Sequence, residues 1–223
     1  MKNFDNSFLK QKIKLVAGAD EVGRGPLAGP VVAASVLFSP DVYIEGVNDS
    51  KQLSEEEREE LVPVIVGKSL ACSVSAVSHI QIDKINILQA SLLAMSMSVN
   101  RLKVKPHLIL VDGNKTFNCS IPTIPIVKGD SQSFAIAAAS ILAKVARDRV
   151  MKRMCPRFPQ YLWSKNKGYA TREHIEAIKT FGPSVFHRKT FLHKILNDEP
   201  EFEFIPKDSF GEMEPPTGQK HLD

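Results

Sequence analysis

Three apolar stretches in the first third of the chain have the length and the composition of β-strands. They cover residues 13–19, 31–38 and 70–77, and segments rich in turn-forming residues separate them. Valine and isoleucine favour strands, whereas Gly, Pro, Asn and Asp favour the turns between strands. The pattern therefore predicts three strands and is compatible with an antiparallel meander.

Helical spacing follows in the middle of the chain. Apolar residues recur every three or four positions between residues 82 and 102, which predicts a long amphipathic helix. Short apolar runs at residues 108–111 and 123–127 predict two more strands, and an alanine-rich segment predicts a second long helix at residues 133–154. Ser54 and Glu57 have the spacing of a capping box, so we expect a further helix to begin there with a solvated acidic first turn.

The order of these elements predicts an α/β protein. A length of 223 residues fits one domain with a small appendage. We expect residues 1–154 to form the main body and residues 155–196 a smaller helical cap. Residues 197–223 are rich in Pro, Glu and Asp, which predicts a largely disordered tail.

Charge is distributed unevenly along the chain. The whole sequence has a formal net charge of +4. The last 27 residues contain eight acids and two lysines, so they carry −6 and the rest of the chain carries about +10. A basic body predicts a polyanionic partner such as a nucleic acid, although a net +4 alone is common for a soluble surface.

The cysteines and the first residues indicate where the protein works. Cys72, Cys119 and Cys155 are odd in number and widely separated, which favours reduced thiols over disulfides or zinc ligands. The first residues have no apolar signal-peptide core, and no apolar run approaches the ~20 residues of a membrane helix. We expect a cytoplasmic protein.

The most informative segment spans residues 17–34, where Asp20 and Glu21 stand directly before a Gly-Arg-Gly turn (residues 23–25). Carboxylates at a strand end are ligands for hard cations such as Mg²⁺ or Mn²⁺. Glycine lets bare backbone approach a ligand, and Arg24 offers a guanidinium that fits phosphate. Because successive strand residues point to opposite faces, the two acids can bind one metal only if the strand ends or bulges between them, and we expect the Gly-Arg-Gly turn to supply that end. The alternative is a solvated strand end with a tight turn.

Two more acids occupy positions where strands should end. Asp112 closes the apolar run 108–111 and precedes Gly113, which predicts a side chain at the carboxyl end of a sheet. Asp130 follows the run 123–127 and precedes the alanine-rich helix, so it is either a site residue or the N-cap of that helix.

At these residues the chain resembles the bacterial ribonuclease HII family, a type 2 ribonuclease H. The resemblance covers roughly residues 13–195, and its motifs are residues 20–34, 49–54, 111–113, 128–130, 137–148, 167–171, 182–183 and 187–191. It implies a ribonuclease H-like fold with a mixed five-stranded sheet flanked by helices. It also implies an endoribonuclease that cuts the RNA strand of RNA–DNA hybrids, and cuts 5′ to ribonucleotides embedded in duplex DNA.

The resemblance gives each acid a role. It implies that Asp20 and Asp112 are bridging or direct ligands of two Mg²⁺ or Mn²⁺ ions, and that Glu21 and Asp130 complete the coordination. The products would be a 5′-phosphate and a 3′-hydroxyl. Asp148 lies too far along the predicted helix from Asp130 to share the ions, so we expect it to pair with Lys144 and Lys152.

The resemblance also implies substrate contacts, because recognition of RNA requires contact with the ribose 2′-hydroxyl. Backbone groups of Gly23, Arg24 and Gly25 would supply such contacts, and Tyr169 would pack on the sugar at an RNA-to-DNA junction. The alternative for Tyr169 is a partly buried structural tyrosine. The residues expected to bind phosphates are Ser50, Lys51, His187 and Arg188. Trp163 is expected in the core of the cap.

Two other functions compete with this one. A Holliday-junction or transposase-type nuclease of the same fold also uses clustered acids, but the Gly-Arg-Gly turn together with Tyr169 disfavours it. A non-catalytic nucleic-acid-binding module would not need all four acids. The resemblance favours a monomer.

Removal of the acidic tail after Leu196 is predicted to leave a folded, active protein that binds duplexes more tightly at low salt. The truncation raises the net charge from +4 to about +10, and binding to a polyanion depends on counterion release. Binding to a hybrid duplex, measured across a salt series with and without the tail, checks this. Weaker binding of the truncated form at every salt concentration would instead make the tail a contact element.

Overall fold

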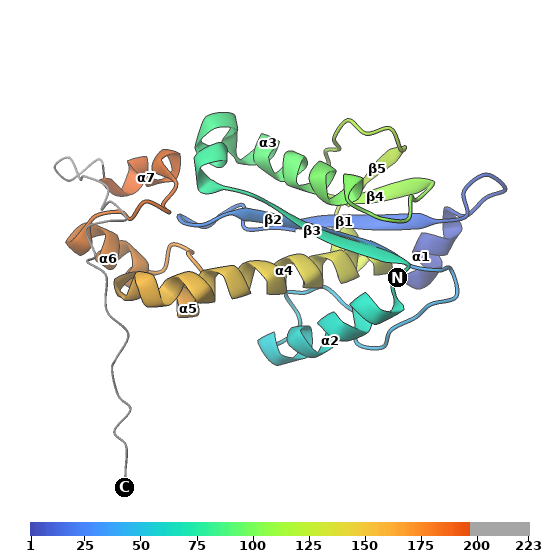
Figure 1. Cartoon of the computed structure of the whole chain (residues 1–223), viewed down its shortest axis with the longest axis horizontal. Coiled ribbons are helices and arrows are strands. Elements are labelled where there is room, and N and C mark those ends of the chain that lie inside the picture. The colour runs from blue at the N-terminus through green and yellow to red at the C-terminus, as the bar shows by residue number, and fades with distance from the viewer. Residues whose placement is uncertain (197–223) are drawn as a thin grey trace, which may run out of the picture.

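A mixed five-stranded sheet forms the centre of the protein (Figure 1). The computed structural model describes residues 1–196, apart from the side chain of Lys194, so the predicted acidic tail lies outside the described residues. The spatial order of the strands is β3-β2-β1-β4-β5. Their bounds are β1 Val16–Val22, β2 Val31–Leu37, β3 Ala71–Val77, β4 Leu108–Asp112 and β5 Thr123–Ile126.

The sheet combines two kinds of pairing. Strands β1, β2 and β3 are antiparallel neighbours, which confirms the predicted meander. Strand β4 pairs with β1 in parallel and β5 pairs with β4 in parallel. All three parallel strands therefore have their carboxyl ends at the same edge of the sheet, where open α/β sheets bind ligands.

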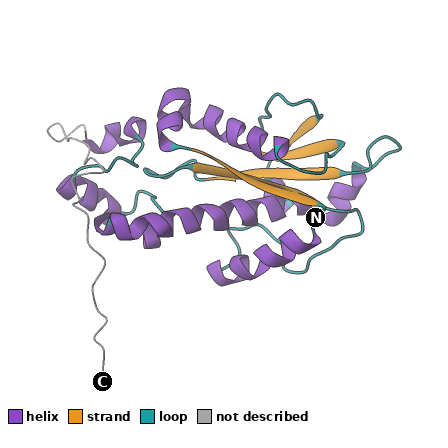
Figure 2. Cartoon of the chain, in the orientation of Figure 1, coloured by secondary structure: helices purple, strands orange, loops and turns teal. Residues whose placement is uncertain are grey.

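Two long helices cover the two faces of this sheet (Figure 2). Helix α3 (His79–Asn100) packs on one face and α4 (Phe134–Met154) on the other, as the sequence predicts. The alanine-rich composition lets α4 lie close to β1: a Cβ on Gly18 would lie 2.2 Å from the backbone of Ala135 and Ile136. Helix α2 (Glu55–Lys68) packs on the outside of α4.

Most predicted boundaries lie within a few residues of the observed ones. Ser54 and Glu57 form the predicted capping box at the start of α2, and Ser133 caps α4. The prediction for the first strand is wrong, because β1 begins and ends three residues later than expected. Asp20 and Glu21 therefore lie within the strand.

The N-terminal segment adds a helix that the sequence pattern does not predict. Helix α1 (Lys2–Ser7) is too short to show a helical period, and its position depends on tertiary contacts. Asp5 is buried and its Oδ2 accepts a hydrogen bond from the backbone N–H of Ala135, at 2.9 Å, in the first turn of α4. The N-terminus thus helps to satisfy the exposed donors at the start of the main helix.

Residues 155–196 form short helices at one end of the sheet, on the left in Figure 1. They are the 3₁₀ helices η2 (Cys155–Arg157) and η3 (Pro159–Tyr161), followed by α5 (Trp163–Asn166), α6 (Arg172–Phe181) and α7 (Lys189–Leu196). Trp163 is fully buried among them, which confirms its place in the core. Leu27, Ala28 and Met151 belong to the same apolar cluster, so this region packs on the main body, and the boundary at residue 154 stays a prediction.

Within residues 1–196 no helix is both long and apolar enough to cross a membrane. The three cysteines are free thiols, as expected for reduced residues.

Candidate active site

Asp20 and Asp112 are neighbours because β1 and β4 pair in parallel. The last paired residues are Ala19 and Val111, and each is followed directly by one of the two acids. Residues in register on adjacent parallel strands share a face, so both carboxylates lie on the face covered by α4. On that face Asp20 accepts a hydrogen bond from Ser140 of α4.

The side chain of Glu21, the next residue of β1, also lies close enough to Asp112 for the two charges to interact. The strand does not end between Asp20 and Glu21 as predicted, because both residues stay paired with β2, opposite Ala34 and Ala33. Pairing with β4 has already stopped at Ala19, so one edge of β1 is open beside Asp112. The charges of Glu21 and Asp112 act on each other across this open edge.

Asp130 lies in the 3₁₀ turn η1 (Gly129–Ser131) between β5 and α4. It is not the N-cap of α4, because Ser133 has that position and its hydroxyl accepts from the backbone N–H of Ile136. The preceding residue ties the turn to the site, since the N–H of Gly129 donates to Oδ1 of Asp112 at 2.7 Å. A Cβ at Gly129 would lie 2.6 Å from Cδ1 of Ile136 and 3.2 Å from Oδ1 of Asp112, so a larger residue there would have to displace neighbouring side chains.

The acids repel one another in a buried environment. Burial raises the pKa of Asp20 well above its usual range, and the charges of Glu21 and Asp112 raise it further. Burial also raises the pKa of Glu21, to which Asp112 adds, while Arg24 opposes the rise. For Asp112, burial and the charge of Asp130 raise the pKa against the hydrogen bond from Gly129. The site thus favours a bound cation.

Two cationic side chains partly offset the negative charge of the acids. The Nζ of Lys51 lies 2.7 Å from Oδ2 of Asp130, and Nη1 of Arg24 lies 3.4 Å from Oε1 of Glu21. Both are exposed, with 77% and 53% of the side chain accessible. In residues 1–196 no group of three or more His, Cys, Asp or Glu side chains is close enough together to hold a metal ion. Glu21 and Asp130 turn toward these cations instead of toward one centre.

The donor set nevertheless fits a hard divalent cation. Carboxylate oxygens are the ligands that Mg²⁺ and Mn²⁺ take in proteins. The Oε2 of Glu21 is buried without a hydrogen-bond partner, which leaves a costly unsatisfied acceptor. A divalent ion among the four acids would satisfy this oxygen and would relieve the repulsion.

The Gly-Arg-Gly turn and Tyr169 lie together beside the acids. Gly23 has φ of +100°, a conformation that favours glycine, and a Cβ there would lie 2.3 Å from Nε of Arg147. A Cβ on Gly25 would lie 3.8 Å from Cε1 of Tyr169, so the ring stands next to the turn. Tyr169 is 41% exposed, which leaves a face of the ring open to a ligand.

Three of the predicted phosphate ligands are buried, and this corrects their assignment. The hydroxyl of Ser50 shares a buried hydrogen bond with Ser140 at 2.8 Å, so Ser50 supports the partner of Asp20 and does not face solvent. His187 bonds Ser184 and His174, and burial lowers its pKa to about 3, so it carries no charge for a phosphate.

Arg188 is the third correction. Its guanidinium is fully buried and donates to the carbonyl oxygens of Gly23, Arg24 and Gly29. Residue type alone cannot distinguish a buried arginine from an exposed one. Lys51 is exposed beside Asp130, so it alone of the four phosphate candidates remains available to a ligand.

Sequence reasoning missed a second buried arginine, Arg147 of α4. A signal was present, because Arg147 stands four residues from Ala143 and from Met151, in line with an apolar stripe of the helix. The adjacent Asp148 pairs with Lys144 at 2.9 Å, as predicted, whereas Lys152 pairs with Glu55 instead.

Comparison with known proteins gives a consistent family. A family model described as Ribonuclease HII matches residues 17–194. The Ribonuclease HII of Rickettsia canadensis is 51% identical over 179 residues, which cover 80% of this chain and 90% of that protein. That of Caldanaerobacter subterraneus subsp. tengcongensis is 47% identical over 196 residues, which cover 88% of this chain and 81% of that protein.

Solved structures agree on the fold. The ribonuclease H2 from Pyrococcus horikoshii has a TM-score of 0.69 at 28% identity and covers 82% of this chain and 98% of its own. Bst-RNase HIII in complex with Mn²⁺ has a TM-score of 0.60 at 20% identity, and the match covers 77% of this chain and 64% of that protein. At this identity the likeness supports the fold alone. The mixed sheet with flanking helices is therefore the ribonuclease H-like fold that the sequence predicted.

Asp112→Asn, and likewise Asp20→Asn, is predicted to abolish cleavage while leaving the metal-free fold as stable as before or more stable. In the first variant the amide oxygen of the new asparagine keeps the bond from Gly129, and the substitution removes one repelling charge. Each kcal/mol of relieved repulsion raises the Tm by about 2–4 °C in a chain of this size. A cleavage assay and metal-free thermal melts check both halves.

Asp148→Asn is the matched control, because it neutralises a buried acid that is paired with Lys144. It should lower the Tm and keep cleavage. Retained activity in the Asp112 variant would remove that residue from the site, and a large loss of Tm would make its role structural.

Proposed function

The chain belongs to the ribonuclease HII family and is a ribonuclease H that cleaves the RNA of RNA–DNA hybrids, and we propose that it does so with two divalent metal ions. It also cuts 5′ to ribonucleotides embedded in duplex DNA. The products are a 5′-phosphate and a 3′-hydroxyl. We further propose that its substrates are duplex nucleic acids, that it works in the cytoplasm and that it acts as a monomer.

One observation carries the proposal: a cluster of buried, mutually repelling acids lies beside a glycine turn and an exposed tyrosine. Asp20 and Asp112 project from the point where the parallel pairing of β1 with β4 ends, and Asp130 joins them from η1. The Gly-Arg-Gly turn follows β1 directly, so the reacting phosphate and the sugar next to it would be held by adjacent residues of the chain.

The four acids would hold the metal ions. Asp20 and Asp112 supply the innermost oxygens because the strand register fixes their spacing, while Glu21 and Asp130 must turn from Arg24 and Lys51 to join them. When bound, two such ions activate a water molecule and stabilise the leaving 3′ oxygen of a phosphodiester. The structural neighbour Bst-RNase HIII was solved in complex with Mn²⁺, an ion of this class.

Lys51 and Arg24 have a second use in this scheme. Each is exposed and pairs with an acid that the metal ions would engage, so ion binding frees both cationic groups. Free cations at the rim of the site would then contact backbone phosphates, which adds affinity without reading sequence. Ser50 is buried and does not bind phosphate in this scheme. Its hydrogen bond to Ser140 holds the Ser140 hydroxyl toward Asp20.

Selection of ribose is the task of the turn and of Tyr169. The ring of Tyr169 stacks over the guanidinium of Arg147, 5.7 Å from Cζ, and stands next to Gly25. A sugar packed on the ring would bring its 2′-hydroxyl to the backbone of the turn, where bare glycine leaves room.

The direct test is a DNA duplex with a single embedded ribonucleotide, incubated with Mg²⁺ or Mn²⁺ beside an all-DNA duplex. We expect one cut on the 5′ side of the ribonucleotide and an intact control. Binding without cleavage in either metal would contradict a catalytic role for the acids, and cuts in the all-DNA duplex would favour a junction-type nuclease.

Tyr169→Ala is predicted to cost more activity on the single ribonucleotide than Tyr169→Phe does. The ring positions the sugar, and positioning affects rate far more than one hydrogen bond. Loss of the hydroxyl removes a net hydrogen bond of ~1 kcal/mol, roughly a fivefold effect.

Tyr43→Ala and Tyr43→Phe are the matched controls, since Tyr43 is 61% exposed and is no part of the proposed site. Initial rates on the same duplex give the comparison. Equal losses in the two Tyr169 variants would show that ring packing is not the important term.

A further inference from the structure

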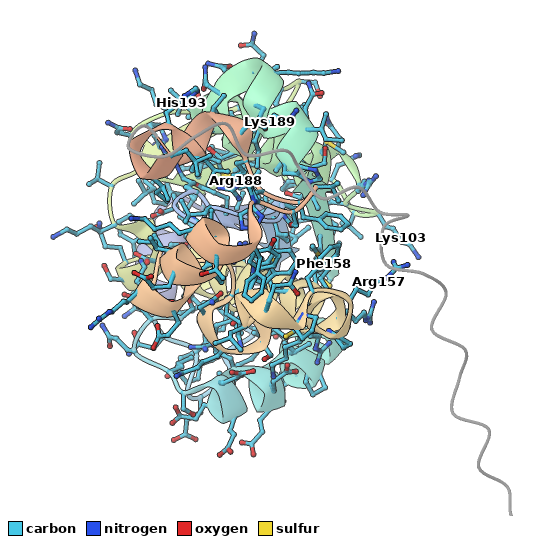
Figure 3. The ribbon with its side chains drawn as sticks, turned by 90° about the vertical axis from the view of Figure 1, so that its left-hand side faces the viewer. Lys103, Arg157, Phe158, Arg188, Lys189 and His193 are labelled. Carbon is cyan, nitrogen blue, oxygen red and sulfur yellow. The ribbon has the colours of Figure 1, made fainter. Side chains whose placement is uncertain are left out.

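Two arginines are fully buried directly beneath the Gly-Arg-Gly turn. Arg147 comes from α4, and Arg188 immediately precedes α7. In Figure 3 Arg188 lies near the middle of the molecule, seen from the end that carries α6 and α7. Within residues 1–196 no carboxylate forms a salt bridge with either guanidinium. Asp83 acts on Arg188 and Asp148 on Arg147 without direct contact. A buried charge without a paired counter-ion is costly, so the two guanidinium groups need other partners.

Their partners are backbone carbonyl oxygens. Arg188 donates to Gly23, Arg24 and Gly29 at 2.6, 3.0 and 3.0 Å. Arg147 donates to Pro30, Lys167 and Ala28 at 3.0, 2.9 and 3.2 Å. Six carbonyl dipoles therefore solvate two cations, and burial together with the charge of Arg147 lowers the pKa of Arg188 to about 9.

The contacts of Arg188 determine which way the turn presents its donors. In a planar trans peptide the C=O and the following N–H point in opposite directions, and the described chain has no cis peptide. Arg188 draws the carbonyls of Gly23 and Arg24 inward, so the N–H groups of Arg24 and Gly25 point outward. No acceptor in residues 1–196 takes either N–H, which leaves both for a ligand.

Arg147 fastens this turn to the segment that carries Tyr169. Its guanidinium bonds the carbonyl of Lys167 and lies under the ring of Tyr169, while its Nε fills the space beside Gly23. Backbone bonds complete the connection, with Leu27 donating to Gly168 and Gly29 donating to Phe186. The turn and the tyrosine, far apart in sequence, are thus held as one unit.

We propose that Arg147 and Arg188 are positioning residues for ribose selection, with Arg188 orienting the N–H groups of Arg24 and Gly25 and Arg147 setting their place relative to Tyr169. The inference rests on the proposed function, because it assumes that the turn reads the 2′-hydroxyl. Neither arginine touches the substrate. Both act through backbone that does.

The test measures selectivity of binding in the inactive Asp112→Asn background. Affinity for a duplex with one ribonucleotide is divided by affinity for the same all-DNA duplex. Arg188→Lys keeps the charge and loses the three-point geometry, and we expect it to lower this ratio by about fivefold for each misaligned donor. Arg147→Lys should lower the ratio by less, since it contacts no carbonyl of the turn itself.

A control separates positioning from plain destabilisation. Ile65→Ala empties a buried site on α2 that packs against α4 and does not touch the turn. It should lower the Tm and leave the selectivity ratio unchanged. If Arg188→Lys lowers only the Tm, its role is structural and the proposal fails. If affinity for both duplexes falls equally, Arg188 serves phosphate binding, and the proposal fails as well.

The wild-type ratio distinguishes this inference from the function on which it rests. A ratio near one in the Asp112→Asn background would contradict ribose reading by the turn before any arginine is changed. If neither arginine variant folds, hydrogen exchange of the wild-type protein decides. Amides of Leu27 and Gly29 that exchange as slowly as those of β1 support a rigid unit, and exchange at the rate of a surface loop overturns it.

Discussion

Repulsion among the buried acids is the constraint on which the rest of the site depends. Carboxylates lose hydration when buried and repel one another, so a fold that gathers them must hold them by other means. Here the parallel register of β1 and β4 places Asp20 beside Asp112, and the N–H of Gly129 bonds Asp112. Lys51 and Arg24 offset part of the charge while remaining exposed. The sheet therefore holds together a cluster of acids whose repulsion a bound cation would relieve.

Beneath the neighbouring Gly-Arg-Gly turn the buried charges are positive instead of negative. Within residues 1–196 neither buried arginine forms a salt bridge with a carboxylate, and both donate their hydrogen bonds to backbone carbonyls instead. Carbonyl oxygens carry only partial charge, so they solvate Arg147 and Arg188 without neutralising them. The same bonds turn N–H groups outward. Acids paired by strand register and cations solvated by backbone thus lie side by side, separated only by Val22 at the end of β1.

Local chemistry explains what the sequence could and could not reveal. Capping residues act within one turn of a helix, so Ser54, Glu57 and Ser133 could be identified from spacing alone. Strand pairing is not local: pairing with β2 extends β1 through Val22, and nothing within residues 16–22 indicates this. The four acids could be identified as candidate metal ligands from their residue type and from their positions at predicted strand ends. By contrast, the burial of Arg188, His187 and Ser50 depends on segments more than 80 residues away or on cap packing, which a linear pattern does not contain.

This dependence on distant segments has a consequence for how the site forms. The acids lie on β1, β4 and η1, which the sheet and α4 can position without the last helices. The turn differs, because its carbonyls bond Arg188 and the loop after it bonds Gly168 and Phe186. Docking of residues 155–196 is thus a condition for presenting the turn and Tyr169 as a pair, since their contacts exist only in the packed state. Under the proposed function, two different parts of one fold would therefore carry out cleavage and select ribose, and the buried arginines lie where those parts meet.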